Sequence, residues 1–209
     1  MRKFEYALKT LGTHSEEVVY EIDKMGKEII AFPAAKLPEY ATKCSAGADF
    51  FCAEEVVIPS ILNEVIKQGL VNKSKDATGW DAIFAANQEL TWDKIFSAER
   101  ISIKPTLVHT GIKACMEEDE VLHLYNRSSN PTRLGLALAN GVGVVDADYY
   151  NNPVNDGEIM FAFYNLSNHD VTLHVGDKLG QGVFEKYLRP ENAVILDEER
   201  NGGFGSTDK

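Results

Sequence analysis

The stretch Asn140-Gly-Val-Gly-Val-Val-Asp-Ala-Asp-Tyr-Tyr150 joins a turn signal to a short β-branched run, two carboxylates and two aromatic rings. An Asn-Gly pair flanked by apolar residues is typical of a tight hairpin. Glycine in such a turn lets a flat ligand lie against main-chain N–H and C=O groups, which can read the edge of a base. Asp146 then stands where it can orient a water molecule, and the ring of Tyr149 can lie under a sugar. The stretch alone is equally typical of an exposed turn, so its interpretation depends on the rest of the chain.

The neighbouring segments have the apolar, β-branched composition of short strands. Residues 170–175 alternate Val171, Leu173 and Val175, which is the pattern of a half-buried strand. Similar runs occupy 28–32, 54–59, 100–116, 120–125, 134–138, 158–166 and 179–187. Many short strands separated by turns predict an all-β sandwich or a jelly-roll-like fold.

Residues 60–98 have a different character, because apolar residues recur there at helical spacing and predict amphipathic helices. Helices within a series of strands indicate an insertion at a loop, where extra residues cost little closure entropy. Their exposed apolar residues alternatively indicate a docking surface for a protein partner. We expect a single domain over residues 1–209, with 1–27 as a leader outside the core, 60–98 as a helical insertion and 199–209 as a mobile C-terminal arm.

The composition of the 209 residues limits the classes of protein to which the chain can belong. A hydrophobic content of 44% and a charged content of 25% are typical of a soluble globular protein. No run reaches the roughly 20 apolar residues of a membrane span, and the first residues lack the apolar core of a signal peptide. The three cysteines form no Cys-x-x-Cys pair, which suits a reducing compartment. We therefore expect a cytoplasmic protein that does not bind a membrane.

The formal net charge of −11 argues against a nucleic-acid partner, because sequence-independent binding to nucleic acid depends on neutralising phosphates. If the ligand is itself an anion, a few cations and a metal ion must oppose the field of the whole protein locally.

Four other short stretches carry residue types that bind anions, metals or flat ligands. Asp49 is the one charged residue among small and aromatic neighbours. The Arg-Ser-Ser run at 127–129 follows a predicted strand and offers a cation, hydroxyl groups and main-chain N–H groups. Gln181 interrupts a strand-like run, and Phe204 stands among glycines near the end of the chain, where stacking on a base would compensate for its ordering. Each signal is weak alone, since Asp49 can equally cap a turn and terminal Gly/Ser segments are often only disordered.

Taken together and in this order, these stretches resemble the five motifs of the trimeric dUTPases, enzymes that hydrolyse dUTP to dUMP and pyrophosphate. The matching stretches are 46–50 (Ala-Gly-Ala-Asp-Phe), 127–129 (Arg-Ser-Ser), 143–149 (Gly-Val-Val-Asp-Ala-Asp-Tyr), 176–181 (Gly-Asp-Lys-Leu-Gly-Gln) and 200–207 (Arg-Asn-Gly-Gly-Phe-Gly-Ser-Thr). Any one of them is unspecific, whereas all five in sequence form a specific signal. The resemblance covers residues 29–207 apart from 60–98. It implies a distorted jelly-roll (β-clip) fold with a mainly helical insertion, a homotrimer, and dUTP as substrate.

The resemblance also implies roles for the residues of the central motifs. Asp146 would be the general base for the water that attacks the α-phosphorus, and its reach and orientation matter more than its nucleophilicity. Ser128 and Gln181 would be catalytic too, Ser128 near the α,β-bridging oxygen and Gln181 at an α-phosphate oxygen or the attacking water. Tyr149 would pack on the deoxyribose and leave no space for a 2′-hydroxyl. The backbone around Gly143 and Val145 would read uracil.

The remaining implied contacts concern the phosphates and the metal. Arg127 and Ser129 would support the phosphate chain. Mg²⁺ would be held mainly by the three phosphates, and Asp49 would reach it through water. From a neighbouring subunit, the C-terminal arm would supply Phe204 over uracil and Arg200, Ser206 and Thr207 at the γ-phosphate, and Gly205 would also belong to the substrate-binding residues.

The chain departs from the family pattern at several positions. Residues 151–156 separate Tyr150 from Gly157, where the family usually passes directly from Asp-Tyr-x to Gly, so we expect an altered pocket rim. Arg200 lies one residue closer to Phe204 than in many members. Lys178 and Gly180 stand where Arg and Ala are common, and both are tolerable. A helical insertion such as 60–98 looks like those of some phage-encoded relatives.

Two alternative functions are consistent with the same stretches. A dCTP deaminase is similar in fold and has an Arg-Ser-Ser stretch, but it needs a glutamate on the strand after the central turn, and Ala162 occupies that position here. A nucleotide-sensing regulatory protein would use the same scaffold and bind a protein partner through residues 60–98. Because the chain retains Asp146, the sequence favours an active diphosphatase.

Overall fold

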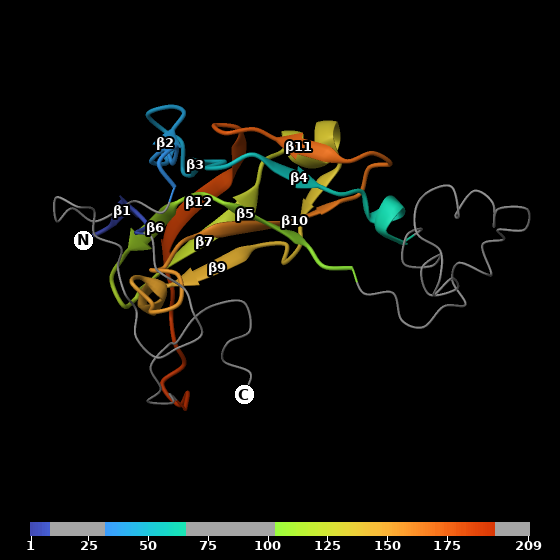
Figure 1. Cartoon of the computed structure of the whole chain (residues 1–209). Helices are drawn as coiled ribbons and strands as arrows, with labels where there is room; N and C mark the ends of the chain where they lie inside the picture. The colour runs from blue at the N-terminus through green and yellow to red at the C-terminus, as the bar shows by residue number, and fades with distance from the viewer. Residues whose placement is uncertain (9–31, 66–102, 195–209) are drawn as a thin grey trace, which may run out of the picture.

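Short β-strands make up nearly all of the regular secondary structure of the described residues, as the sequence predicts (Figure 1). The computed structural model describes residues 1–8, 32–65 and 103–194. The strands are β1 (Lys3–Tyr6), β2 (Glu39–Tyr40), β3 (Ala48–Phe51), β4 (Val56–Ile58), β5 (Thr106–His109), β6 (Ile112–Cys115), β7 (Glu120–Asn126), β8 (Leu136–Leu138), β9 (Gly143–Asp146), β10 (Met160–Asn165), β11 (Val171–Leu173) and β12 (Lys178–Lys186). A π-helical turn, η2 (Asn130–Leu134), follows β7, and a 3₁₀ turn, η3 (Ala147–Tyr149), follows β9.

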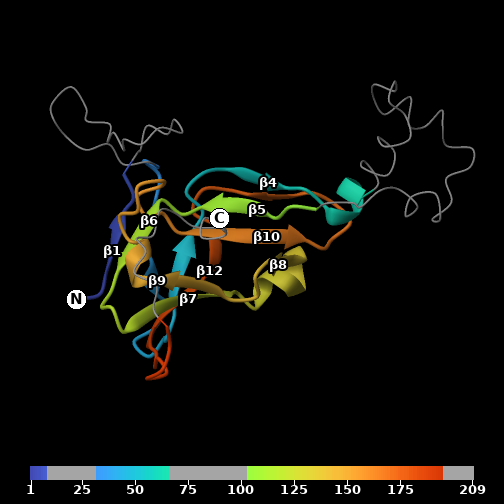
Figure 2. The ribbon, with the colours of Figure 1, turned by 90° about the horizontal axis from the view of Figure 1, so that it is seen from below.

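The strands pair antiparallel in four small sheets that enclose one core. The largest sheet has the order β2-β3-β12-β7-β9, and the others are β5-β10-β8, β11-β4 and β1-β6. Figure 2 shows β5 and β10 side by side in a layer apart from β7 and β9. Aromatic rings fill the space between the layers, and the Phe50 and Phe161 ring centroids are 5.7 Å apart.

Glycine in β12 allows these rings to touch the backbone. A Cβ on Gly180 would lie 2.1 Å from Cε1 of Phe161 and 2.6 Å from the carbonyl oxygen of Tyr125. A Cβ on Gly182 would lie 2.5 Å from Cε2 of Phe50. A Cβ atom cannot approach other atoms at any of these three distances. The packing against Phe161 therefore requires Gly180, even though alanine is common at this place in the family motif.

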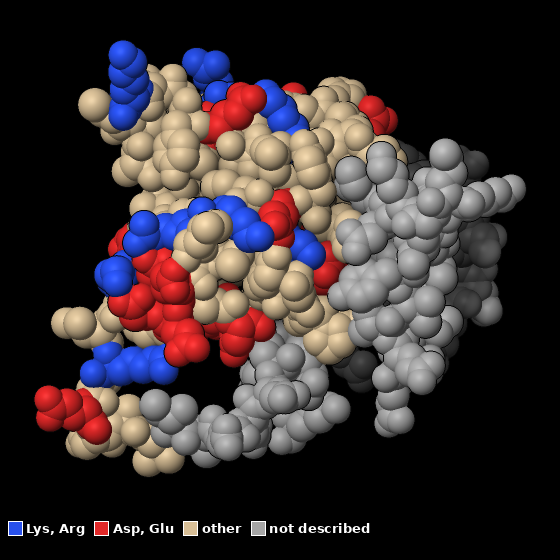
Figure 3. Space-filling view, turned by 90° about the vertical axis from the view of Figure 1, so that its left-hand side faces the viewer, with Lys and Arg blue, Asp and Glu red and all other residues tan. Residues whose placement is uncertain are grey.

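The prediction that residues 1–27 form a leader outside the core is wrong for the first eight residues. Strand β1 pairs with β6, with Phe4 opposite Ala114. The Phe4 ring lies 5.4 Å from that of Phe50 and 5.2 Å from that of Phe184, and Ala7 is completely buried. Figure 3 shows this side of the molecule, where acidic and basic side chains lie next to one another. The charged residues Lys3 and Glu5 obscure the alternating pattern of this short strand, and Glu5 is half-buried where it accepts a hydrogen bond from the Tyr150 hydroxyl.

The Asn-Gly turn does not close a hairpin, which corrects the simplest interpretation of the central stretch. Strand β8 pairs with β10, whereas β9 pairs with β7, so the turn crosses from one sheet to another. A two-residue type I′ hairpin needs a positive φ at both central residues. Here Gly141 has a φ of +70° and Asn140 does not have a positive φ. The crossover opens the sheets at this point and leaves the main chain of β9 accessible.

The predicted insertion at 60–98 begins with a short helix over residues 61–65, and its other residues lie outside the described part of the chain. The main-chain N–H of Ser60 donates to Oδ1 of Asp170 at 2.9 Å, and its hydroxyl donates to the carbonyl of Ser167 at 2.6 Å. These bonds fix the start of the insertion to the turn after β10, at the end of the molecule away from β1 (Figures 1 and 2). Three other predicted segments also lie outside the described residues: most of the leader, most of the strand at 28–32, and the arm at 199–209.

Within the described ranges, the helices are too short to cross a lipid bilayer.

Candidate active site

A cavity of about 200 Å³ lies where β9 leaves β7 and approaches β10. Its lining includes Asn140 and Gly143 from the turn and β9, Tyr149 from η3, and Met160 and Ala162 from β10. Val145, which also lines it, contributes a mostly buried side chain. The cavity is thus a mainly apolar slot with a glycine-bearing strand on one wall, which suits a flat heterocycle.

Gly143 is required on that wall because of close packing behind it. A Cβ on Gly143 would lie 2.9 Å from Cβ of Leu124 on β7. The bare backbone therefore sits directly on the neighbouring strand and keeps its other edge open toward the cavity. Both Gly143 and Val145 thus line the cavity, and their role in reading uracil stays a prediction.

Tyr149 forms a buried wall of the cavity and is 7% exposed. Its hydroxyl donates to the carbonyl oxygen of Glu158 at 3.0 Å and accepts from Nδ2 of Asn155 at 2.8 Å. Both functions of the hydroxyl are satisfied inside the protein. Tyr149 can therefore offer a ligand the face of its ring but not its hydroxyl.

Asp146 follows Val145 directly, at the point where β9 ends and η3 begins. The backbone of Asp146 is still extended, with φ −79° and ψ 159°, and the residue is half-buried. The carboxylate therefore stands one residue beyond the lining of the cavity, on the strand that presents the glycine backbone.

A second group of predicted residues forms a charged cluster where β3 meets β12. Oδ2 of Asp49 accepts from Nζ of Lys178 at 2.6 Å, and Oδ1 accepts from Nε2 of Gln181 at 3.1 Å. Burial raises the pKa of Asp49, but the hydrogen bonds and charges of Lys178, Gln181 and Arg127 outweigh it, and the pKa lies below its usual value. The carboxylate is thus held ionised.

The Arg-Ser-Ser run lies beside this cluster, at the end of β7. Arg127 donates from Nη1 to the carbonyl of Lys178 at 3.4 Å. Ser128 is exposed and Ser129 is half-buried. The next residue, Asn130, is buried and donates to the carbonyl of Leu179 at 2.7 Å, which ties the run to β12. The contacts of Arg127 and Asn130 therefore place the Arg-Ser-Ser run next to the start of β12, the strand that carries Gln181.

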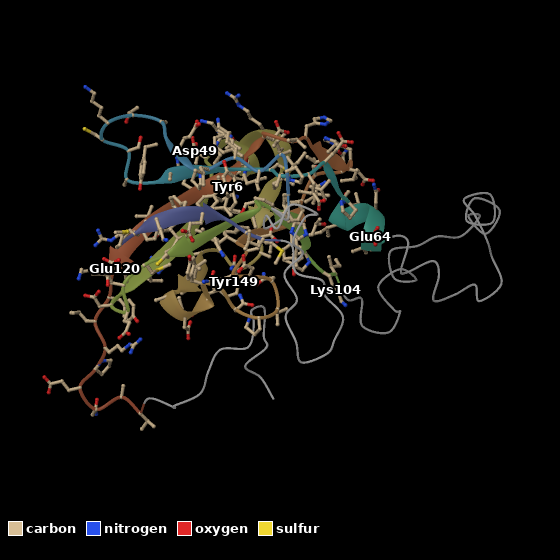
Figure 4. The ribbon with its side chains drawn as sticks, turned by 60° about the vertical axis from the view of Figure 1, so that its left-hand side comes forward. Tyr6, Asp49, Glu64, Lys104, Glu120 and Tyr149 are labelled. Atoms are coloured by element: carbon tan, nitrogen blue, oxygen red, sulfur yellow. The ribbon has the colours of Figure 1, made fainter. Side chains whose placement is uncertain are left out.

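The structure brings the predicted residues together in two groups, not one. Along β7, Asp146 lies opposite Val121, whereas Gln181 lies opposite Tyr125. Four residues of strand correspond to ~13 Å at roughly 3.3 Å per residue. Figure 4 likewise shows Asp49 and Tyr149 on opposite sides of the ribbon. A single copy of the chain does not place Asp146 beside Gln181.

The arm residues predicted to contact substrate, Arg200, Phe204, Gly205, Ser206 and Thr207, lie outside the described part of the chain.

Residues of the 151–157 loop contact the site, although the sequence indicated only an altered rim there. Asn152 and Asn155 both bond to Tyr149, and Asn151 and Asp156 have positive φ values of 56° and 58°. Asn and Asp tolerate this conformation better than other residues with a Cβ. The run Asn-Asn-Pro-Val-Asn-Asp-Gly therefore contained a turn signal that could have predicted a compact, internally bonded loop.

Comparisons with known proteins identify the family to which the chain belongs. The sequence model of the dUTPase family matches residues 92–208. The deoxyuridine 5′-triphosphate nucleotidohydrolase of Lactococcus lactis is 45% identical to the chain over 117 residues, which cover 54% of this chain and 78% of that protein.

Two solved structures are similar in fold. A dUTPase from Streptococcus mutans has a TM-score of 0.53 and 34% identity, and the alignment covers 75% of this chain and 89% of that one. A mutant dUTPase of the S. aureus phage phi11, whose structure shows a coordinated structural Mg(II) ion, has a TM-score of 0.50 and 18% identity, with 80% and 94% covered. By the extent of the family match and the identity to these relatives, this chain is a member of the dUTPase family.

Proposed function

We propose that the chain hydrolyses dUTP to dUMP and pyrophosphate. The observation that carries the proposal is the slot lined by Gly143 and Tyr149, with Asp146 one residue beyond Val145 of its lining. Hydrolysis of deoxyuridine triphosphate is also the activity for which the Lactococcus relative and the Streptococcus enzyme are named.

The slot accounts for recognition of the nucleoside. The main chain at Gly143 and Val145 would hydrogen-bond the uracil edge, where groups of fixed geometry distinguish bases. The Tyr149 ring, which is buried and hydrogen-bonded through its hydroxyl, would pack on the deoxyribose and leave no space for a 2′-hydroxyl. Discrimination against ribonucleotides would thus follow from shape.

Asp146 would carry the chemical step as a general base. It would accept a proton from a water molecule as the water oxygen bonds to the α-phosphorus. The bond from that phosphorus to the α,β-bridging oxygen would break, and pyrophosphate would leave with the bonding electrons. Ser128 would donate a hydrogen bond near the bridging oxygen as its charge grows, and Gln181 would hold the water or an α-phosphate oxygen.

A complete site would form between copies of the chain. Because Asp146 and Gln181 lie ~13 Å apart along β7 at roughly 3.3 Å per residue, one copy cannot place both on one phosphate. The Arg127, Ser128, Ser129 and Gln181 side chains of a neighbouring copy would meet the triphosphate of a nucleotide bound in the slot. The proposed homotrimer supplies this neighbour, and Arg200, Phe204, Gly205, Ser206 and Thr207 would cover the nucleotide from another copy.

Magnesium would be an ion carried mainly by the triphosphate. In the described residues there is no cluster of three or more His, Cys, Asp or Glu side chains that could hold a metal. One carboxylate, Asp49, lies in the charged cluster, and Mg²⁺ commonly uses one or two carboxylates together with phosphates and water. These residues therefore fit an ion that Asp49 reaches through water, and the ion would neutralise charge on the phosphates.

The insertion at residues 60–98 would be a docking element for a protein partner, within a single cytoplasmic domain that also has a mobile arm at 199–209. Deleting the insertion should then spare hydrolysis. Loss of folding together with activity would instead give the insertion a structural role.

The test of the activity is a panel of dUTP, dTTP, dCTP and UTP with Mg²⁺, scored for pyrophosphate and for ammonia. We expect pyrophosphate from dUTP alone. Ammonia from dCTP would favour the deaminase alternative, although Ala162 in the lining offers no carboxylate for that reaction.

A further inference from the structure

The 151–157 loop is bonded to itself through two asparagine side chains. Asn152 is 3% exposed, and its Oδ1 accepts from the N–H groups of Val154 at 3.0 Å and Asn155 at 3.2 Å. Its Nδ2 donates to the carbonyl of Tyr149 at 3.0 Å and to Oδ1 of Asn155 at 2.7 Å. These bonds give the loop one defined shape, and the bond to the Tyr149 carbonyl attaches the beginning of the loop to the main chain of Tyr149.

The loop is also anchored from outside, to β6 and to the N-terminal segment. Oδ2 of Asp156 accepts from Nζ of Lys113 at 2.8 Å and from the main-chain N–H of Leu8 at 2.7 Å. The same ammonium donates to Oδ1 of Asn151 at 2.6 Å. The side chains of Lys113 and Asp156 are 8% and 1% exposed, so the anchor is a buried ion pair.

The end of the loop returns tightly onto its beginning. Gly157 has a φ of +79°, and a Cβ there would lie 2.6 Å from the carbonyl oxygen of Tyr149 and 2.9 Å from the main-chain nitrogen of Asn151. The loop can therefore neither slide nor swing without moving Tyr149.

Asn155 links this rigid loop to the tip of the Tyr149 side chain. Its Nδ2 donates to the Tyr149 hydroxyl at 2.8 Å and to the carbonyl of Glu158 at 3.1 Å, and that carbonyl also accepts from the Tyr149 hydroxyl. The hydroxyl is thus held from two directions, which fixes the tilt of the ring.

We propose that Asn155 is a positioning residue that sets sugar specificity by fixing the Tyr149 ring against the deoxyribose. This inference rests on the proposed function, and it assigns the 151–157 loop a role in discriminating 2′-deoxyribose from ribose. A ring released from Asn155 can tilt about its Cβ–Cγ and Cα–Cβ bonds and open space for a 2′-hydroxyl. The substrate class rejected by this device is the uridine ribonucleotides.

The test compares wild type with Asn155→Asp, which keeps the size of the side chain and its acceptor oxygen but loses the two donated bonds. We expect the ratio of kcat/KM for dUTP over UTP to fall about tenfold, because the half-buried hydrogen bond that holds the Tyr149 hydroxyl from the loop is lost. Tyr149→Phe removes the hydroxyl and should lower the ratio similarly. The double variant should fall no further than the single ones, since both act through one bond. Val154→Ala, at a side chain 63% exposed in the same loop, is the matched control and should keep the wild-type ratio.

A second readout that needs no turnover is the Kd for UMP divided by the Kd for dUMP, measured by calorimetry. It should shrink in Asn155→Asp and stay unchanged in Val154→Ala. A purely structural role would lower Tm and leave both ratios intact, and that result would overturn the inference. Should Asn155→Asp fail to fold, an unchanged ratio in Tyr149→Phe would overturn it instead. Wild-type protein that discriminates dUMP from UMP but releases no pyrophosphate from dUTP would refute the proposed hydrolysis and leave the role of Asn155 to be judged on binding.

Discussion

The slot and the charged cluster are built by opposite means, although one reaction is expected to use both. The Tyr149 wall is held by neutral hydrogen bonds to the half-buried Asn155, the buried Asn152 and the Glu158 carbonyl. The cluster at Asp49 is held by charge, with Lys178 as its main partner. The slot therefore suits recognition by shape, and the cluster suits a ligand whose charge must be matched.

The two regions also differ in how easily they rearrange. The side chain of Lys178 is 40% exposed, and ion pairs near water contribute little and re-form readily. Tyr149 itself is buried, as are its bonds to Glu158 and Asn152, and an unsatisfied buried group there would cost about 1–3 kcal/mol. We infer that the nucleoside meets a preformed surface, whereas the phosphates and Mg²⁺ exchange ion pairs with the cluster as they bind.

The largest effect is expected at the edge of the slot, from Asp146→Asn. The amide keeps the shape of the carboxylate but cannot take a proton, so kcat should fall about 10²–10⁴-fold while the Kd for a non-hydrolysable dUTP analogue changes little. Single-turnover rates and calorimetry measure the two quantities. Asp148→Asn, at an exposed acid two residues further on, is the control and should retain turnover. Full activity in Asp146→Asn would remove this carboxylate from the mechanism and leave the slot as a binding site only.

The next effect tests the rigidity of the slot through its anchor. Lys113→Met should destabilise the protein by about 3–5 kcal/mol, because it leaves Asp156 charged and buried without its partner. Lys186→Met breaks another Lys–Asp pair, with Asp119, whose side chains are 63% and 57% exposed, and should have a much smaller effect on stability because water screens the pair. Urea denaturation at one fixed protein concentration measures both. Equal effects would mean that the anchor is not needed to hold the loop.

The same contrast explains what could be predicted from the sequence. The all-β architecture and the separate motifs were readable, because strand alternation and short functional runs are local patterns. Asp49 and Gln181 were each predicted from their own motif, and the register of β3 with β12 places them opposite each other. The Asn140-Gly141 pair correctly indicated a turn at the site.

What the sequence could not supply depends on distant contacts. The strand at residues 3–6 is short and charged, and only its pairing with β6 and the packing of Phe4 on Phe50 make it part of the core. The turn at Asn140 crosses between sheets because β8 finds its partner in β10, more than 20 positions along the chain. The separation of Asp146 from Gln181 follows from strand register, which no single motif contains.

A smaller effect concerns the charged cluster. Lys178→Met should raise the pKa of Asp49, because burial would then act with less opposition from hydrogen bonds and charge. Carboxyl-carbon NMR across an acid titration measures this shift. Lys43→Met, at an exposed lysine, serves as the control and should leave Asp49 unchanged. An unaltered pKa in Lys178→Met would show that Gln181 and Arg127 suffice to hold the charge, and the cluster would then be less open to rearrangement than we infer.

The smallest effect is expected at His109, which contacts the side chain of Glu158, the residue whose carbonyl accepts from the Tyr149 hydroxyl. Nδ1 of His109 lies 2.9 Å from Oε2 of Glu158, and this hydrogen bond raises the pKa of His109 above 6.5 against the opposing effect of burial. A raised folded-state pKa stabilises the protein fully below pH 6.5, and the contribution is lost as the pH rises through the folded-state pKa. The difference in unfolding free energy between wild type and His109→Asn should therefore shrink with rising pH above 6.5, when measured by urea denaturation at constant protein concentration. His169→Asn, at an exposed histidine, should show a smaller change with pH. A difference for His109→Asn that is constant across this range would mean that the imidazole supports Glu158 by packing and neutral hydrogen bonding alone. The support of the Glu158 carbonyl, and with it of the Tyr149 hydroxyl, would then depend on charge no more than the slot itself does.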